Sequence, residues 1–204
     1  MALHTTKIPT EGLLQRFLDN DFEQIFCEKC MNTFLTNVYD DGEYVILEKF
    51  ALGLEYYREA IQQTHIKSTP RLEFLGVLDG MANQVLDPSV IQLRTHDEPD
   101  YRLIYVMEKL QHLPPEDEQF FTNHVHGLDW FDESTRHNTL KWLEHKYGEQ
   151  LSHDIRQLCR YFRANQAFIG WDLHGDNLMM RPNTQELVIL DPFTLQPHDF
   201  SFEE

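Results

Sequence analysis

A polar loop lies between two apolar segments near the C-terminal end of the chain. Residues 169–180 read IGWDLHGDNLMM, and residues 187–193 read LVILDPF. Asp172 and Asn177 are five positions apart in the loop, and Asp191 ends the second apolar run. The apolar runs on either side of the turn RPNTQ predict a β-hairpin that returns the chain to Asp191. We therefore expect the three side chains to converge at one end of this hairpin.

A long amphipathic helix is expected directly before the loop. In LSHDIRQLCRYFRANQAFIG, apolar residues recur at helical spacing and form one stripe, which includes Leu151, Ile155, Leu158 and Phe162. Such a stripe usually faces a core. The pattern predicts that a buried helix delivers the polar loop.

The first half of the chain reads as strands around one helix. Its opening segment, Glu11–Cys30, has apolar residues at spacings of three and four and predicts a further helix. The next segment, TFLTNVYDDGEYVILEKF, has the turn signal DDG between two β-branched and apolar runs, which predicts a hairpin. A helix is expected over 52–63, and strands over 71–78 and 101–110. Residues 116–147 then combine helical patches with loop signals.

Composition limits the classes of protein and of partner. The chain has 204 residues and is 41% hydrophobic and 12% aromatic, which suits one globular domain or one domain in two lobes. It carries 17 Lys and Arg against 34 Asp and Glu, for a net charge of −17. That charge argues against general binding to a nucleic-acid backbone. An acidic surface instead favours basic partners or solubility, or it could imitate nucleic acid.

The cysteines and the N-terminal residues bear on the cellular compartment. Cys27, Cys30 and Cys159 are an odd count, which makes a disulfide framework unexpected and favours a reducing compartment. The pair in CEKC has no second metal-binding pair at finger spacing and is interpreted as structural. The N-terminus lacks a signal-peptide pattern, and no apolar run reaches roughly 18 residues. We therefore expect a cytoplasmic protein without a membrane segment.

The loop and hairpin carry the residue types of a phosphoryl-transfer site. Asn177 and Asp191 would offer the oxygen ligands that Mg²⁺ prefers, with coordination positions left for phosphate oxygens. Asp172 would then be able to accept a proton from a hydroxyl group or to orient it for attack. The scattered histidines, among them His126 in HVH, show no recurring ligand spacing and are interpreted as polar surface.

The same residues resemble a known superfamily. DLHGDNLMM followed by VILDP is similar to the catalytic and metal-binding segments of the protein kinase-like superfamily. The form resembles aminoglycoside phosphotransferases and, more closely, the small early serine/threonine protein kinases of lytic bacteriophages. The resemblance implies that Asp172 is the catalytic aspartate and that His174 occupies the basic position near the transferred phosphate. It also implies that Asn177 and Asp191 bind the metal, with ATP and Mg²⁺ as cofactors.

The resemblance implies a fold as well. We expect an α+β protein with a minimal two-lobed protein kinase-like fold. Residues 1–106 would form a strand-rich, nucleotide-binding lobe, and residues 107–204 a helical lobe with the catalytic loop and the metal-binding hairpin. The hinge would lie near Met107 to Leu110, where backbone groups of Glu108 and Leu110 would hold the adenine edge.

The nucleotide lobe departs from the pattern of the superfamily. No glycine occurs in residues 30–39, where a glycine-rich loop is expected. Leu47 stands at the position expected for the phosphate-binding lysine, and Lys49 follows two residues later on the same strand face. Lys49 would reach the phosphates through a small bulge or register shift, paired with Glu55 or Glu59. The alternative is a degenerate nucleotide site.

The resulting functional prediction is ATP-dependent transfer of phosphate to Ser or Thr of proteins. The substrates would be basic proteins, and host proteins in the host cytoplasm if a phage encodes the chain. Two alternatives stay open. One is a catalytically weak pseudokinase or acidic protein that inhibits a basic host partner, and the other is a small-molecule phosphotransferase. No membrane or direct nucleic-acid partner is expected.

Overall fold

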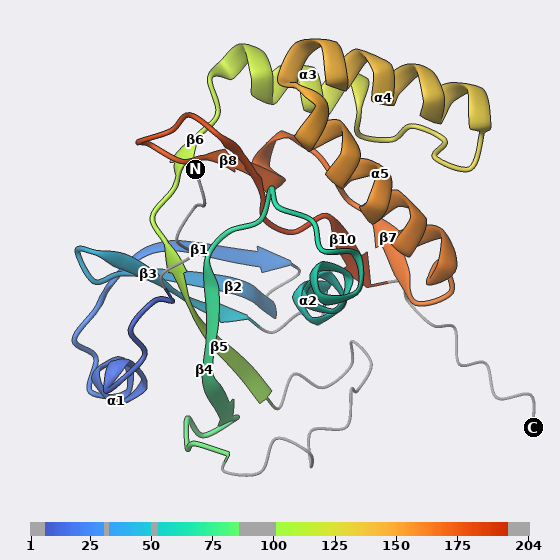
Figure 1. Cartoon of the computed structure of the whole chain (residues 1–204). Helices are drawn as coiled ribbons and strands as arrows, with labels where there is room; N and C mark the ends of the chain where they lie inside the picture. Colours follow the sequence, from blue (N-terminus) through green and yellow to red (C-terminus); the bar gives the residue numbers. More distant parts are fainter. Residues whose placement is uncertain (1–6, 31–32, 50–52, 86–100, 196–204) are drawn as a thin grey trace, which may run out of the picture. The chain divides into compact units, whose positions relative to one another are not determined.

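The chain has a mixed α+β structure that divides into two compact units. The computed structural model describes residues 7–30, 33–49, 53–85 and 101–195 (Figure 1). The first unit combines residues 1–51 with 70–109, and the second combines 52–69 with 110–204. The expected α+β class is confirmed by a five-stranded antiparallel sheet and several helices. The division into lobes at residues 106 and 107 stays a prediction.

The first unit is built on the five-stranded sheet, in the order β1-β2-β3-β5-β4. Its strands are β1 (Glu23–Cys30), β2 (Thr33–Asp40), β3 (Tyr44–Lys49), β4 (Leu72–Asp79) and β5 (Tyr101–Glu108). The predicted hairpin around DDG is confirmed, since β2 and β3 pair antiparallel and Gly42 takes a positive φ of 92°. The strands expected over 71–78 and 101–110 are β4 and β5. Residues 101–106 therefore lie in the sheet. The hinge expected near Met107 to Leu110 requires such a strand before it, and the hinge itself stays a prediction.

The helix predicted over Glu11–Cys30 is wrong beyond its first turns. Helix α1 covers only Leu13–Leu18, and Asn20 then takes a left-handed φ of 60°. The segment from Glu23 pairs with β2 as an edge strand. Ile25 and Phe26 are each 54% exposed, so they do not continue the buried stripe of the helix. Pairing with β2 supplied backbone hydrogen bonds that the helical spacing could not reveal.

The core of the first unit lies between α1 and one face of the sheet. Helix α1 approaches closely at Gly76 of β4, where a Cβ atom would lie 2.9 Å from Leu14 Cδ2. The buried cluster on this face consists of Ile8, Leu13, Ile46, Leu78, Ile104 and Val106. Leu14, Phe17, Leu18 and Phe22 pack against it from the N-terminal segment.

The second unit contains the longer helices and two small sheets of short strands. Its helices are α2 (Gly53–Thr64), α3 (Pro115–His124), α4 (Glu133–Tyr147) and α5 (Glu149–Ala164), with a 3₁₀ turn η2 (Gly175–Asn177). Its strands are β6 (Gln111–His112), β7 (Ile169–Trp171), β8 (Leu178–Met180), β9 (Leu187–Ile189) and β10 (Phe193–Leu195). β7 pairs with β10, and β8 lies between β6 and β9. The predicted helix over 52–63 and the predicted hairpin after the polar loop are confirmed.

Helix α5 supplies much of the core of the second unit. The predicted stripe is confirmed, with Leu151, Ile155, Leu158 and Phe162 all buried. Asp154 on the same helix is fully buried as well, and its Oδ2 accepts hydrogen bonds from the backbone N–H groups of Lys67 at 3.0 Å and Ser68 at 2.7 Å. This carboxylate therefore fixes the segment after α2 on the helix. Among the described residues, no helix has both the length and the apolar composition needed to cross a bilayer.

Candidate active site

The polar loop is held at the end of the β8–β9 hairpin by backbone hydrogen bonds on both sides of Asp191. The N–H of Leu190 donates to the carbonyl of Asn177 at 2.9 Å, and the N–H of Asp172 donates to the carbonyl of Pro192 at 2.9 Å. The chain therefore passes Asn177, turns at Asp191 and meets Asp172 within a few residues. The predicted convergence of the loop and the end of the hairpin is present in the backbone.

Asn177 ties the two ends of the loop together through its amide. Its Nδ2 donates to the carbonyl of Asp172 at 2.7 Å and lies 3.0 Å from Nε2 of His174. Because a carbonyl only accepts, the first bond identifies the amide nitrogen and leaves Oδ1 on the other side. Asn177 therefore combines a structural amide nitrogen with an oxygen that is left for a ligand.

His174 lies between two carboxylates of the loop. Its Nε2 is 3.8 Å from Oδ1 of Asp172, and its Nδ1 is 3.6 Å from Oδ2 of Asp176. The ring is 28% exposed. His174 therefore lies beside Asp172, and its predicted place near a transferred phosphate stays a prediction.

The electrostatic environment of Asp172 is mixed. Burial raises the pKa of this carboxyl above 3.8, although His174 and His126 lower it. The carboxylate of Asp191 raises the pKa of Asp172 further, which indicates that the two acids lie close enough to interact. A partly buried carboxylate with a raised pKa is a reasonable proton acceptor.

Helix α3 packs against the loop, a contact that the sequence did not reveal. The N–H of Gly175 lies 3.3 Å from Oγ1 of Thr122, and the His126 ring lies 5.5 Å, centroid to centroid, from that of His174. The side chain of His126 is exposed, and its backbone N–H donates to the carbonyl of Phe121 near the end of α3. The glycine within LHGDN was the one available sequence signal for close packing. Nothing in HVH pointed to the loop.

Gly175→Ala is expected to destabilise the second unit by about 1–3 kcal/mol, the usual cost of overpacking. A Cβ atom there would lie 2.5 Å from the backbone oxygen of Glu118 and 2.6 Å from its Cγ. Urea denaturation of both proteins measures the loss. The double variant with Glu118→Ala serves as the control, because the backbone oxygen remains and should prevent rescue. Full rescue by Glu118→Ala would place the clash in the side chain alone.

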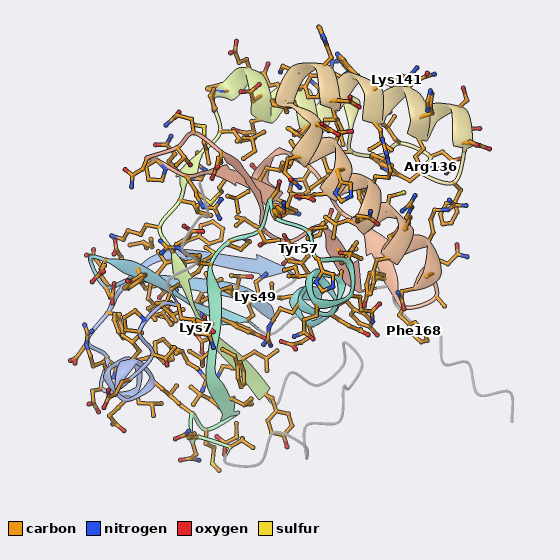
Figure 2. The ribbon with its side chains drawn as sticks, in the orientation of Figure 1. Lys7, Lys49, Tyr57, Arg136, Lys141 and Phe168 are labelled. Atoms are coloured by element: carbon orange, nitrogen blue, oxygen red, sulfur yellow. The ribbon has the colours of Figure 1, made fainter. Side chains whose placement is uncertain are left out.

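Strand β9, which leads to Asp191, is anchored from two sides within the second unit. Tyr57 of α2 (Figure 2) is fully buried and donates from its hydroxyl to the carbonyl of Ile189 at 2.7 Å. The N–H of Ile189 donates to the carbonyl of Ser68 at 2.9 Å, in the segment that Asp154 fixes. Burial raises the pKa of Tyr57 well above 10, and the carboxylates of Asp191 and Asp154 raise it further. Tyr57 therefore stays a neutral hydrogen-bond donor behind the site.

The predicted phosphate-binding lysine and its acidic partners can each be located. Lys49 (Figure 2) ends β3 in the first unit. Leu103 of β5 is its partner across the two strands. In the second unit, the carboxylate of Glu59 accepts from the hydroxyl of Tyr161 at 2.7 Å and from Nε2 of Gln63 at 2.7 Å. Glu55 accepts from Arg58 at 3.1 Å. The choice between Glu55 and Glu59 as partner of Lys49 stays open.

The predicted adenine contacts follow β5. Glu108 is buried, and its carboxylate accepts from the N–H of Arg71 at 2.8 Å and from Arg71 Nε at 3.2 Å. Its own N–H donates to the carbonyl of Arg71 at 3.0 Å. The prediction assigns the adenine contact to backbone groups of Glu108 and Leu110. That prediction stays open.

The donor set suits a hard divalent cation that also binds phosphate. The Oδ1 of Asn177 and the carboxylate of Asp191 would offer two kinds of oxygen ligand, and such a pair would need phosphate or water oxygens to complete six-coordination. Within the described ranges, no group of three His, Cys, Asp or Glu side chains could hold a metal by itself. The two residues therefore suit Mg²⁺ that is also bound by nucleotide phosphates. They are too few to hold a metal through protein side chains alone.

Comparison with known proteins does not extend these observations. No protein-family model matches the chain, and no curated protein matches it.

Proposed function

We propose that the chain is an ATP-dependent protein kinase that transfers phosphate to Ser or Thr of proteins. The observation that carries the proposal is the pair of backbone hydrogen bonds, Leu190 to Asn177 and Asp172 to Pro192, that bracket Asp191. They hold the backbone of Asn177, Asp191 and Asp172 at one end of a hairpin, and the pKa of the Asp172 carboxyl is raised there. This is the set of groups that phosphoryl transfer requires.

Each loop residue has a defined task in the proposed reaction. Asp172 orients the substrate hydroxyl and accepts its proton as the hydroxyl oxygen attacks the γ-phosphorus. The bond from the γ-phosphorus to the bridging oxygen breaks, and ADP leaves. Asn177 and Asp191 would hold Mg²⁺, which neutralises phosphate charge when it is bound. His174 lies beside Asp172 and offers an imidazole to the transferred phosphoryl group.

The proposed architecture is a minimal two-lobed protein kinase-like fold. In its favour, the first unit is a five-stranded antiparallel sheet, and the second contains a long buried helix followed by the loop and hairpin. The nucleotide would bind with help from Lys49, Glu59, Glu108 and Leu110, as the resemblance implies. Protein substrates of basic character suit the net charge of −17.

Incubation of the purified protein with labelled ATP and a cytoplasmic extract tests the proposal. Label from [γ-³²P]ATP should appear on Ser or Thr of the protein itself or of basic proteins in the extract. A parallel incubation with [α-³²P]ATP is the control, because phosphoryl transfer leaves the α-phosphate on ADP. Label from the α-position would indicate nucleotidyl transfer. No γ-label with either Mg²⁺ or Mn²⁺ would favour a pseudokinase that acts by binding.

Lys49→Ala is expected to weaken ATP binding about ten- to a hundredfold, because a charge-assisted hydrogen bond to phosphate contributes roughly 1.5–3 kcal/mol. Isothermal titration calorimetry with Mg²⁺ and ATP measures the change. Lys141→Ala is the matched control, since Lys141 is an exposed lysine on α4 and its loss changes the net charge equally (Figure 2). Equal affinities in the two variants would show that Lys49 has not replaced the lysine missing at Leu47.

A further inference from the structure

A cavity of about 200 Å³ lies in the first unit, on the face of the sheet that α1 covers. We call it the α1 cavity. Its wall combines aromatic, aliphatic and polar side chains: Phe17, Phe22, Tyr39, Leu18, Leu78, Ala82, Asn20, Glu48 and Arg102. None of these residues takes part in the proposed phosphoryl transfer. Small-molecule sites likewise combine aromatic side chains with convergent polar groups, although the wall of this cavity is more polar than is usual for them.

The carboxylate of Glu48, in the wall of the cavity, already accepts hydrogen bonds on both of its oxygens. The side chain of Glu48 is only 3% exposed. Its Oε1 accepts from Arg102 NH1 at 2.6 Å, and its Oε2 accepts from Asn37 Nδ2 at 2.7 Å and from the Tyr39 hydroxyl at 2.9 Å. Burying a charge is costly, and these three donors offset the cost. Glu48 therefore compensates the charge of Arg102 and has little need of a further donor from a ligand.

Arg102 provides hydrogen-bond donors to the α1 cavity. It is 22% exposed, and it donates to Glu48 and to the carbonyl of Asp79 at 3.3 Å. Among the described residues, these bonds use two of the five guanidinium N–H groups. A ligand in the cavity would meet N–H donors whose positive charge is already paired. This setting favours a neutral acceptor, such as a carbonyl or a ring nitrogen, over an anion.

The aromatic side chains in the wall favour a planar ring. Phe17 lies edge-on to Tyr39, with centroids 5.0 Å apart, and 6.4 Å from Phe22. Ala82, which also lines the cavity, has a left-handed φ of 65°, a conformation that costs an alanine about 1–2 kcal/mol. Strained backbone of this kind collects at functional sites. For scale, an apolar cavity of about 150 Å³ in another protein holds benzene.

We propose that the α1 cavity binds an uncharged, planar, single-ring compound that carries a hydrogen-bond acceptor. The ring packs against Phe17, Phe22 and Tyr39, and the acceptor takes an N–H group of Arg102. The cavity shares no residue with the proposed kinase site, so its test is independent of phosphoryl transfer.

Benzamide is the probe, and ¹H–¹⁵N NMR of the full chain is the readout. Benzamide should bind with a millimolar Kd and shift the signals of Arg102 Nε and of backbone amides around Tyr39. Benzoate and benzylamine, with the same ring, should bind at least about tenfold more weakly. The paired charges of Glu48 and Arg102 leave no net charge to offset the desolvation of either ion, and the ammonium group also offers no acceptor. No shift with benzamide up to its solubility limit would overturn the proposal. Tighter binding of benzoate would overturn the preference for a neutral ligand.

Two variants tie the binding to the cavity. Leu18→Trp adds a ring from α1 into the α1 cavity and should abolish the shifts, while a native-like spectrum shows that the protein is folded. The double variant Glu48→Gln with Arg102→Met removes the donors without leaving one buried charge alone. It should weaken benzamide at least about tenfold. Unchanged benzamide binding in both folded variants would place the ligand elsewhere and refute the site.

Discussion

Asp172→Asn is expected to slow transfer of the γ-phosphate by about 10²- to 10⁴-fold while leaving ATP affinity within about threefold. The substitution keeps the size of the side chain and removes the group that accepts the proton. The backbone carbonyl of Asp172, which holds Asn177 at 2.7 Å, is unaffected. The loop should therefore keep its shape. Initial rates of transfer and calorimetry with ATP measure the two effects separately.

The matched control is Asp176→Asn in the same loop. Asp176 is 76% exposed and also lies beside His174, so it tests whether any loss of loop charge has the same effect. Its transfer rate should stay within about threefold of the wild type. Burial raises the pKa of Asp172 above 3.8, so the acid limb of the wild-type pH–rate profile should lie above that value. Equal rate losses in the two variants would contradict the assignment of Asp172.

Asp191→Ala is expected to weaken Mg²⁺-dependent ATP binding about ten- to a hundredfold, because a charged oxygen ligand is lost. Transfer should fall at least as far. Calorimetry with ATP in the presence of Mg²⁺, and again in excess EDTA, measures the metal-dependent part. The affinities of variant and wild type should differ with Mg²⁺ and converge in EDTA.

Glu186→Ala is the control for this substitution. Glu186 is an exposed carboxylate in the same β8–β9 hairpin, where it pairs with Arg181 at 3.2 Å. It should leave metal-dependent binding unchanged. Thermal melting of both variants shows whether the fold is kept. A folded Asp191→Ala protein with wild-type heats would mean that the metal binds elsewhere.

Local patterns predicted the elements that form the candidate site. The alternation and turn residues around DDG and RPNTQ identified both hairpins, because turn chemistry acts over a few residues. The stripe on α5 was equally visible, since a wide apolar face repeats with the helical period. Asn177 and Asp191 could be assigned to one end of a hairpin because β8 and β9 are adjacent in the chain.

Long-range contacts were not predictable in this way. Tyr57 and Ile189 are 132 positions apart, and Lys67 and Asp154 are 87 apart, so no local pattern joins them. The same holds for α3 against the loop, which brings His126 beside His174. Phe26, on the edge strand β1, shows that a local pattern can also predict the wrong element. Its helical spacing was real, but pairing of β1 with β2 decided the local structure.

The most direct test of phosphoryl transfer is a side-by-side assay of the wild type, Asp172→Asn and Asp176→Asn with [γ-³²P]ATP and Mg²⁺. The acceptor is identified by phosphoamino-acid analysis. Phosphoserine or phosphothreonine is expected from the wild type and from Asp176→Asn, and a loss of about 10²-fold or more in Asp172→Asn. Absence of γ-label from the wild type, or label that persists at the wild-type rate in Asp172→Asn, would contradict this expectation.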